Sequence, residues 1–299
     1  MARITSEHGR KLLNLSVGLW CAIAVAGQLI FAAYVVLFYG GSVASGHIEH
    51  WNKVLPRGYA PGDTFGNLMV GLHLAFTGLI ILGGAAQLLP SLRRHWPGAH
   101  RWNGRLFMSA ALVLSLGGLV MVWTRSSPGR LAQHIAISLN ALVILLCAAL
   151  AWRHARARRI DQHRRWALRL FLAVSGVWFF RVGLMAWLAI HQAPVGFDPK
   201  TFTGPFLIAL NFAQFLVPLA VLELYFRAQA TPKATPKLAL AGFILCLTAL
   251  TALGLWLFDV PNIALLSAIV FLCGFIPIVG VFLSSLPILL FGAQVGGLP

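Results

Sequence analysis

The chain has 299 residues, of which 59% are hydrophobic and 10% are charged, and its formal net charge at pH 7 is +16. A soluble domain of this length would carry about 25% charged residues, so the composition excludes an ordinary soluble protein. Apolar segments of about 20 residues recur along the chain, which is the length that a helix needs to cross a hydrocarbon core of about 30 Å. The sequence therefore predicts an all-α, polytopic transmembrane helix bundle.

The apolar pattern predicts about eight membrane segments. Within a few residues, the first seven run from Leu12 to Phe38, Phe65 to Leu89, Leu106 to Trp123, Leu131 to Trp152, Asp161 to Ile190, Phe206 to Tyr225 and Leu238 to Phe258. The last stretch, from Ile263 to the end, contains Pro277 and Pro287 and is expected to be kinked or broken. The polar run RAQATPKATPK divides the chain into a six-helix core at residues 1–227, a cytoplasmic linker at 228–237 and a two-element hydrophobic tail at 238–299.

Positive charge is concentrated in the N-terminus and in the loops SLRRHWPGAHRWNGR and RHARARRIDQHRR. Cytoplasmic loops of membrane proteins carry an excess of Lys and Arg, so the N-terminus is predicted to be cytoplasmic. The same rule, together with binding to anionic lipid headgroups, explains the net charge without nucleic acid as a partner.

Histidines lie near the starts of four successive segments, at His73, His100, His134 and His163. Because successive helices run in opposite directions, His73 and His134 would lie toward the outer face, and His100 and His163 toward the cytoplasmic face. Paired imidazoles on facing helices hold a haem iron from both sides. The alternation therefore predicts two haem b groups with bis-His ligation. Histidines that contact lipid phosphate at the membrane surface are the alternative interpretation.

Three arginines could bind anionic groups. Arg101 and Arg164 directly follow the inner histidines and would pair with haem propionates. Arg181 lies within the fifth apolar segment, where an unpaired charge is costly and indicates function. The acidic residue inside a predicted helix, Glu223, is expected at the cytoplasmic end of that helix. A propionate, a lipid phosphate or an acidic substrate is thus the expected partner of Arg181, and an arginine in a small water-filled cavity is the alternative.

The loop after the first segment contains SGHIEHW, in which His47, Glu49 and His50 could bind zinc or copper. The pattern by itself has no fixed helical context and no fourth ligand, so a solvated loop is the alternative. The sequence contains no nucleotide-binding loop and no nucleophile elbow, and it gives hydrolase chemistry no support.

Three runs carry a resemblance to a bacterial family: HLAFTGLIILGGAAQ from His73, HRWNGR from His100 and HRRWALR from His163. They resemble the multi-pass membrane family called domain of unknown function 2306, over about Phe65 to Arg227. The resemblance implies a helical protein of the bacterial cytoplasmic (inner) membrane and brings no established activity. The polar positions of the family map onto His73, His100, Arg101, His163, Arg164, Arg169 and Arg181. The tail, from GLWLFDVP onward, resembles a part of the autoinducer-2 exporter permease family, and we carry no transport activity over from it.

Two hypotheses of function follow from these residues. The first is a di-haem b-type protein that moves electrons across the membrane, from a quinol or another redox donor to an outer acceptor. The second is a carrier or sensor, without cofactor, for a small anion or a lipid that binds Arg181. The first predicts a coloured protein and the second a colourless one.

Overall fold

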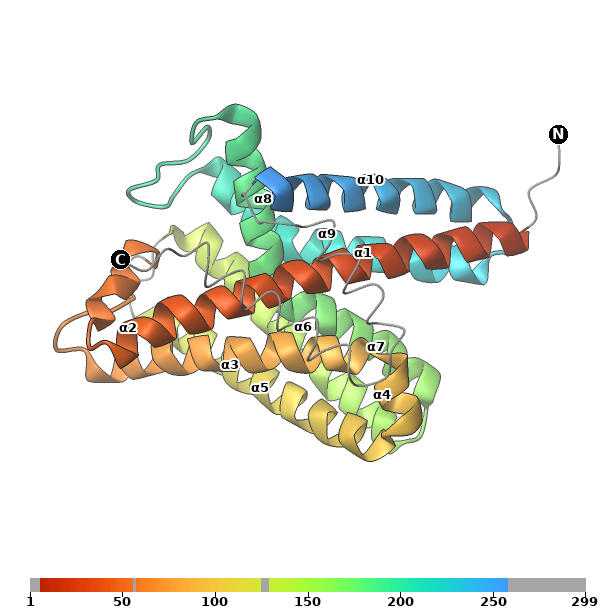
Figure 1. Cartoon of the computed structure of the whole chain (residues 1–299), viewed down its shortest axis with the longest axis horizontal. Coiled ribbons are helices and arrows are strands. Elements are labelled where there is room, and N and C mark those ends of the chain that lie inside the picture. The colour runs from red at the N-terminus through yellow and green to blue at the C-terminus, as the bar shows by residue number, and fades with distance from the viewer. Residues whose placement is uncertain (1–5, 56–57, 125–128, 258–299) are drawn as a thin grey trace. The chain divides into compact units, whose positions relative to one another are not determined.

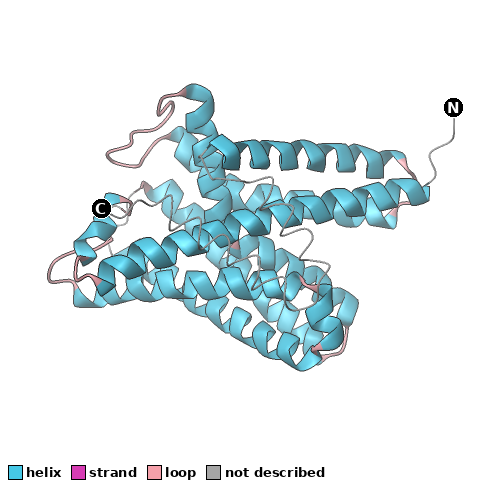
Figure 2. Ribbon diagram, in the orientation of Figure 1, coloured by secondary structure: helices cyan, strands magenta, loops and turns pink. Residues whose placement is uncertain are grey.

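The computed structural model describes residues 6–55, 58–124 and 129–257, with side chains up to residue 252. Within these ranges the chain is helical, as Figure 2 shows, and the pairing of β type is one isolated bridge between Asp198 and Thr203. The predicted all-α fold class is confirmed.

Among the residues that the structure describes, six helices are long and apolar enough to cross a membrane. The first span, Ser6–Ala44, comprises α1 (Ser6–Tyr34), η1 (Val35–Gly40) and α2 (Gly41–Ala44). The other five are α3 (Thr64–Leu88), α5 (Pro97–Thr124), α6 (Leu131–Arg156), α9 (Pro205–Ala230) and the part Thr235–Ala252 of α10 (Thr235–Leu257). A seventh span is added if α7 (Ile160–Val174) and α8 (Gly176–His191), which are bent by 48°, form one. Each predicted segment up to Phe258 thus has its counterpart, whereas the stretch from Ile263 lies outside the described residues.

The start of α5 differs from the prediction. The helix begins at Pro97, after the short helix α4 (Pro90–His95), and not at Leu106. Proline suits the first turn of a helix because its missing N–H would have no partner there. The polar run HRWNGR is therefore part of the helix. With 28 residues, α5 is about 42 Å long, which exceeds the thickness of the hydrocarbon core.

The chain divides into two compact units. One is the continuous range Phe31–Leu216, and the other combines the described residues of the two ranges Met1–Ile30 and Val217–Pro299. In the first of these, α5 packs against α3 and α6, and α6 packs against α7 (Figure 1). Their core consists of Ile80, Phe107, Ala110, Ala111, Ile144, Cys147, Leu170 and Ala173. Small residues in this core allow close helix packing, which stabilises bundles in lipid where no hydrophobic effect drives the helices together.

The C-terminal half of α3 packs closely against its neighbours. A Cβ on Gly84 would lie 3.1 Å from ring atoms of both Phe107 and Phe171. The side chain of Asn103 donates from Nδ2 to the carbonyl oxygen of Gly83 at 2.8 Å. One turn further, Gln87 donates from Nε2 to the carbonyl oxygen of His100 at 2.9 Å. These contacts hold α3 and α5 together at the end of the bundle that carries His100.

A polar region surrounds the bend between α7 and α8. The hydroxyl of Ser175 donates back to the carbonyl oxygen of Phe171 at 2.8 Å, a contact that bends helices. A Cβ on Gly176 would lie 3.0 Å from Nδ2 of Asn140 and 3.5 Å from Oε1 of Gln214. The Oδ1 atom of Asn140 is buried without a hydrogen-bond partner. Polar groups within a membrane bundle are rare and mark functional regions.

The other unit packs α9 and α10 against the N-terminal part of α1 (Figure 1), around Leu13, Ala228, Leu240, Ala241 and Ile244. Lys237 is buried and donates from Nζ to the hydroxyl of Ser6 at 2.7 Å. The linker predicted at residues 228–237 falls inside this unit, where α9 runs to Ala230 and α10 begins at Thr235.

We expect Leu13→Ala to lower the stability of this unit by about 2 kcal/mol, because the side chain is fully buried and its loss leaves a cavity. Leu15 is 60% exposed, and lipid would fill the space that Leu15→Ala vacates, so this control should unfold like wild type. Thermal unfolding in detergent, followed by tryptophan fluorescence, measures both. Equal losses for the two variants would contradict the packing of α1 described here.

Candidate functional site

Arg181 lies in the second turn of α8, against aromatic side chains. Its Cζ atom is 4.9 Å from the centre of the Phe31 ring. Its charge also interacts electrostatically with Tyr34 and Tyr39. A cation over an aromatic face contributes about 0.5–2 kcal/mol, more when it is desolvated. The aromatic residues therefore stabilise the charge of Arg181 without neutralising it.

Arg181 forms no ion pair with an acidic side chain in the part of the chain that the structure describes, unlike Lys11, which pairs with Glu7, and His47, which pairs with Glu49. The Nε atom of Arg181 is buried and has no hydrogen-bond partner. The amide of Asn211 donates within its own helix instead, to the carbonyl oxygen of Leu207 at 2.7 Å. A buried donor without a partner costs about 1–3 kcal/mol, and more if it is charged. A partner for Arg181 from outside the protein therefore stays a prediction.

Tyr39, one of the aromatic residues on which the charge of Arg181 acts, belongs to an unusual stretch of helix. The segment η1 is π-helical, and such turns are rare and concentrate at functional sites. The buried indole of Trp51 donates from Nε1 to the carbonyl oxygen of Tyr39 at 3.1 Å, and the two rings meet edge to face. Val35, Val70 of α3 and these two rings form one buried cluster. Trp51 thereby fixes the π-helical turn that faces Arg181.

His73 lies on α3 between two packed regions. One turn before it, Val70 belongs to the cluster around Tyr39 and Trp51, and Phe76 packs against the core of the bundle. The Nδ1 atom of His73 is buried and has no hydrogen-bond partner. The imidazole therefore joins Asn140 and Arg181 as a polar group of this unit with a buried atom and unused hydrogen-bonding capacity.

The predicted outer pair, His73 and His134, lies on helices α3 and α6. His134 lies in the first turn of α6, and its ring meets that of Trp123 edge to face at 5.9 Å. Helices α3 and α6 each pack against α5. No described contact joins the two histidines, so ligation of an outer haem by this pair stays a prediction.

His100 lies in the first turn of α5, and His163 lies in the first turn of α7. His100 interacts electrostatically with the charges of Arg93, His163 and Arg101. The Nδ1 atom of His163 is 2.9 Å from the carbonyl oxygen of Ala151, so Nδ1 carries the proton and Nε2 is left as the free nitrogen. The Nδ1 atom of His100 is buried without a partner. Arg101 and Arg164, which follow these histidines, are both exposed.

The sequence analysis missed His154, which is buried near the C-terminal end of α6 and whose Nδ1 atom has no hydrogen-bond partner. Its position in the basic run RHARARR suggested a cytoplasmic loop. The residue continues the buried stripe of Ile144, Cys147 and Ala151, and this helical spacing was the signal that could have found it. His154 adds a third imidazole to the end of the bundle that carries His100 and His163.

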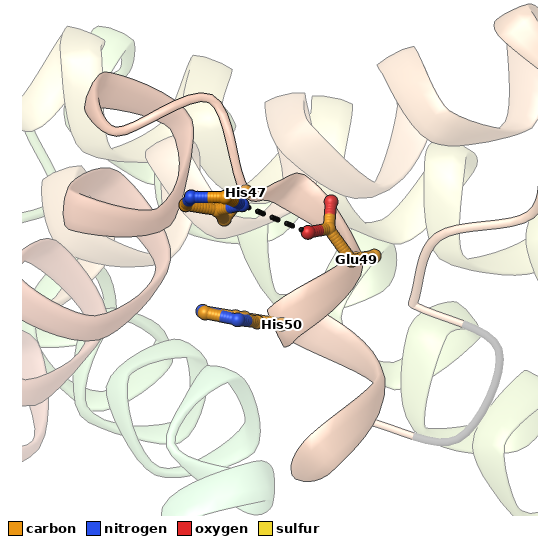
Figure 3. Close-up of side chains that lie close together, drawn as sticks. All are labelled: His47, Glu49 and His50. Atoms are coloured by element: carbon orange, nitrogen blue, oxygen red, sulfur yellow. Dashed lines mark hydrogen bonds and ion pairs between the residues drawn. The ribbon is translucent and has the colours of Figure 1, made fainter.

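A further cluster lies in the loop between α2 and α3. His47, Glu49 and His50 each offer a ligand atom, and these atoms lie within 4.8 Å of one another (Figure 3). The carboxylate of Glu49 accepts hydrogen bonds from its own backbone N–H and from the ring of His47, which together hold its pKa below the ordinary value. The loop thus has the defined local structure that the sequence pattern alone did not show.

Long apolar helices, six of them able to cross a membrane among the described residues, define a polytopic helical membrane protein. The chain belongs to the family described as predicted membrane protein (DUF2306), whose sequence pattern matches residues 70–226. No curated protein and no solved structure matches the chain. The match includes every residue of the two predicted histidine pairs, together with Arg101, Arg164 and Arg181. It does not reach the tail, whose resemblance to the autoinducer-2 exporters stays a prediction on residues that are mostly outside the described ranges.

Proposed function

We propose that the protein is a carrier or sensor for a small anion or an anionic lipid, in a bacterial cytoplasmic membrane, and that Arg181 is the residue that binds the anionic group. The observation that supports this proposal is the half-buried Arg181, whose Nε atom is buried without a hydrogen-bond partner and whose Cζ atom lies 4.9 Å from the centre of the Phe31 ring. A charge placed this way is costly unless something binds it.

The chemistry of guanidinium specifies the kind of ligand. Its planar fork of N–H donors matches the two oxygens of a carboxylate or a phosphate, and the two parallel hydrogen bonds fix the orientation of the anion. The Nε atom of Arg181 has no hydrogen-bond partner within the protein, so its N–H is available to donate to an oxygen of such an anion. The phenol groups of Tyr34 and Tyr39 are further donors close to the same charge. The shared chemistry of the ligand is therefore an oxyanion.

The proposal is tested by thermal unfolding of the purified protein with defined probes. Inorganic phosphate and acetate test a free anion, and nanodiscs of phosphatidylglycerol, compared with phosphatidylcholine, test a lipid headgroup. We expect one of these oxyanions to raise the unfolding temperature of wild type, because a ligand that binds only the folded state stabilises it. If neither the free anions nor the anionic lipid raise it, the proposal is wrong.

The geometry of His163 favours a second candidate function, electron transfer through haem b. Imidazoles that bind a metal through Nε2 commonly donate from Nδ1 to a backbone carbonyl, as His163 does to Ala151. His100 is the other proposed ligand, and the charge of His163 acts on it, so two imidazoles of the kind that hold a low-spin haem iron are present at this end of the bundle. Arg101 and Arg164 would pair with the propionates, a quinol or another donor would supply electrons, and His73 with His134 would hold a second haem.

This candidate predicts sharp reduced-minus-oxidised absorbance bands from protein made in haem-replete cells. We expect His163→Ala to remove the absorbance of the inner haem, whereas His95→Ala, which changes an exposed histidine on α4, should keep it. About two haems per chain would support both pairs and about one would support the inner pair alone. Protein without haem absorbance would exclude this candidate and leave the proposal on Arg181 standing.

A further inference from the structure

The loop between α2 and α3 brings three metal-ligating side chains to one place. His47 directly precedes the 3₁₀-helix η2 (Ile48–Lys53), and Glu49 and His50 lie within it. The rings of His47 and His50 are stacked, with their centres 5.3 Å apart and their planes at 18°. The Oε1 atom of Glu49 lies 3.1 Å from Nδ1 of His47. Figure 3 shows the carboxylate directed at the ring of His47, with the ring of His50 alongside.

The local backbone explains this juxtaposition. A 3₁₀-helix has about three residues per turn, so side chains three positions apart point in the same direction. The backbone N–H of His50 donates to the carbonyl oxygen of His47 at 3.1 Å, which closes such a turn between the two histidines. The spacing His-x-x-His therefore becomes a pair of imidazoles on one side of the turn, with Glu49 between them in sequence.

Hydrogen bonds fix the backbone of the segment that carries these ligands to residues that precede it and to residues that follow it in the chain. Trp51, the next residue, is 3% exposed and donates from its indole to the carbonyl oxygen of Tyr39. Asn52 donates from Nδ2 to the carbonyl oxygen of Tyr59 at 2.8 Å and accepts from the backbone N–H of Tyr59 at 2.9 Å. A backbone fixed in this way loses little conformational entropy when the ligands close around an ion.

The donor set selects the class of ion. Two imidazole nitrogens and one carboxylate suit Zn²⁺ and Cu²⁺, whereas Ca²⁺ and Mg²⁺ prefer oxygen ligands. Zinc holds such donors at about 2.0–2.2 Å, so donor atoms within 4.8 Å of one another need only small side-chain rotations to bind one ion. Glu49 and His47 are exposed and His50 is half-buried, so these rotations are unhindered and water can complete the coordination.

We propose that His47, Glu49 and His50 form a binding site for a divalent transition metal ion of the Zn²⁺ or Cu²⁺ class, on the outer side of the membrane. The site is independent of Arg181 and of the histidine pairs on α3, α5, α6 and α7. It uses three protein ligands and leaves a coordination position open to solvent.

The proposal is tested on the full-length protein in detergent, purified without a polyhistidine tag and stripped of metal by chelator. Titration with Cu²⁺ alone, followed by electron paramagnetic resonance, should give about one ion per chain with nitrogen hyperfine splitting from imidazole. Calorimetric titration with Zn²⁺ alone measures the affinity. We expect His47→Gln and His50→Gln each to weaken binding at least about tenfold, and the double variant to lose the nitrogen splitting.

His191→Gln is the matched control, since it replaces an exposed histidine at the end of α8, outside the cluster. It should bind both ions like wild type. The proposal is overturned if wild type binds neither ion, if the double variant binds as well as wild type, or if His191→Gln loses as much affinity as His50→Gln. Unfolding temperatures without metal should agree among all variants, because none of the replaced rings belongs to a buried cluster.

Discussion

Arg181→Ala is expected to abolish the thermal stabilisation that an oxyanion gives to wild type, while the unfolding free energy without ligand falls by no more than about 1 kcal/mol. The substitution removes the cation over Phe31, which destabilises, and it also removes a buried donor without a partner, which stabilises. The two effects oppose each other. An arginine kept for folding would show the opposite result, a large loss of stability.

Arg181→Lys separates the charge from the planar fork. Lysine keeps the positive charge but cannot form two parallel hydrogen bonds to one oxyanion, so we expect weaker binding, by about tenfold or more. Arg105 supplies the matched control, because its Cζ atom also lies 4.9 Å from the centre of an aromatic ring, that of Trp102, although its side chain is exposed. Arg105→Ala should leave the stabilisation by oxyanion unchanged. Equal ligand stabilisation of wild type, Arg181→Lys and Arg181→Ala would reject the proposed function.

Gly84→Ala is expected to destabilise the bundle of α3, α5, α6 and α7 by about 1–3 kcal/mol, and Gly84→Val by more. A Cβ at this position would lie 3.1 Å from ring atoms of Phe107 and Phe171. Both rings are buried, at 6% and 8% exposure, so neither can move away without displacing its own neighbours.

Gly78→Ala on the same helix is the control, and its expected effect has the opposite sign. A Cβ at Gly78 meets no atom within 4 Å. Replacing glycine by alanine within a helix then stabilises by about 0.5–1 kcal/mol, because the unfolded chain loses conformational freedom. Denaturant unfolding of both variants in the same detergent measures the difference. If Gly84→Ala proved as stable as Gly78→Ala, the close packing of α3 against the two phenylalanines would be wrong.

The membrane segments could be predicted from the sequence because each depends on its own residues. A run of about 20 apolar residues meets the requirement of the bilayer whatever its neighbours are. The features that escaped prediction depend on local backbone geometry within such runs. The bend at Ser175 and the π-helical turn η1 both lie in stretches that are apolar throughout, so hydropathy shows no interruption. Likewise, α5 begins at Pro97, before its apolar residues. A helix can extend beyond the hydrocarbon core, and an apolar pattern does not show the polar part of such a helix.

The sequence alone determined which residues are out of place in a membrane, and Arg181 and His73 could be singled out on that basis. The free energy of placing such a group in lipid depends on its own chemistry and its depth. The tertiary structure alone decided the contacts that these groups make, such as the ring of Phe31 beside Arg181 and the carbonyl oxygen of Ala151 at Nδ1 of His163. These contacts join different helices. They depend on how the helices pack, and packing is a property of pairs of surfaces that no single segment contains.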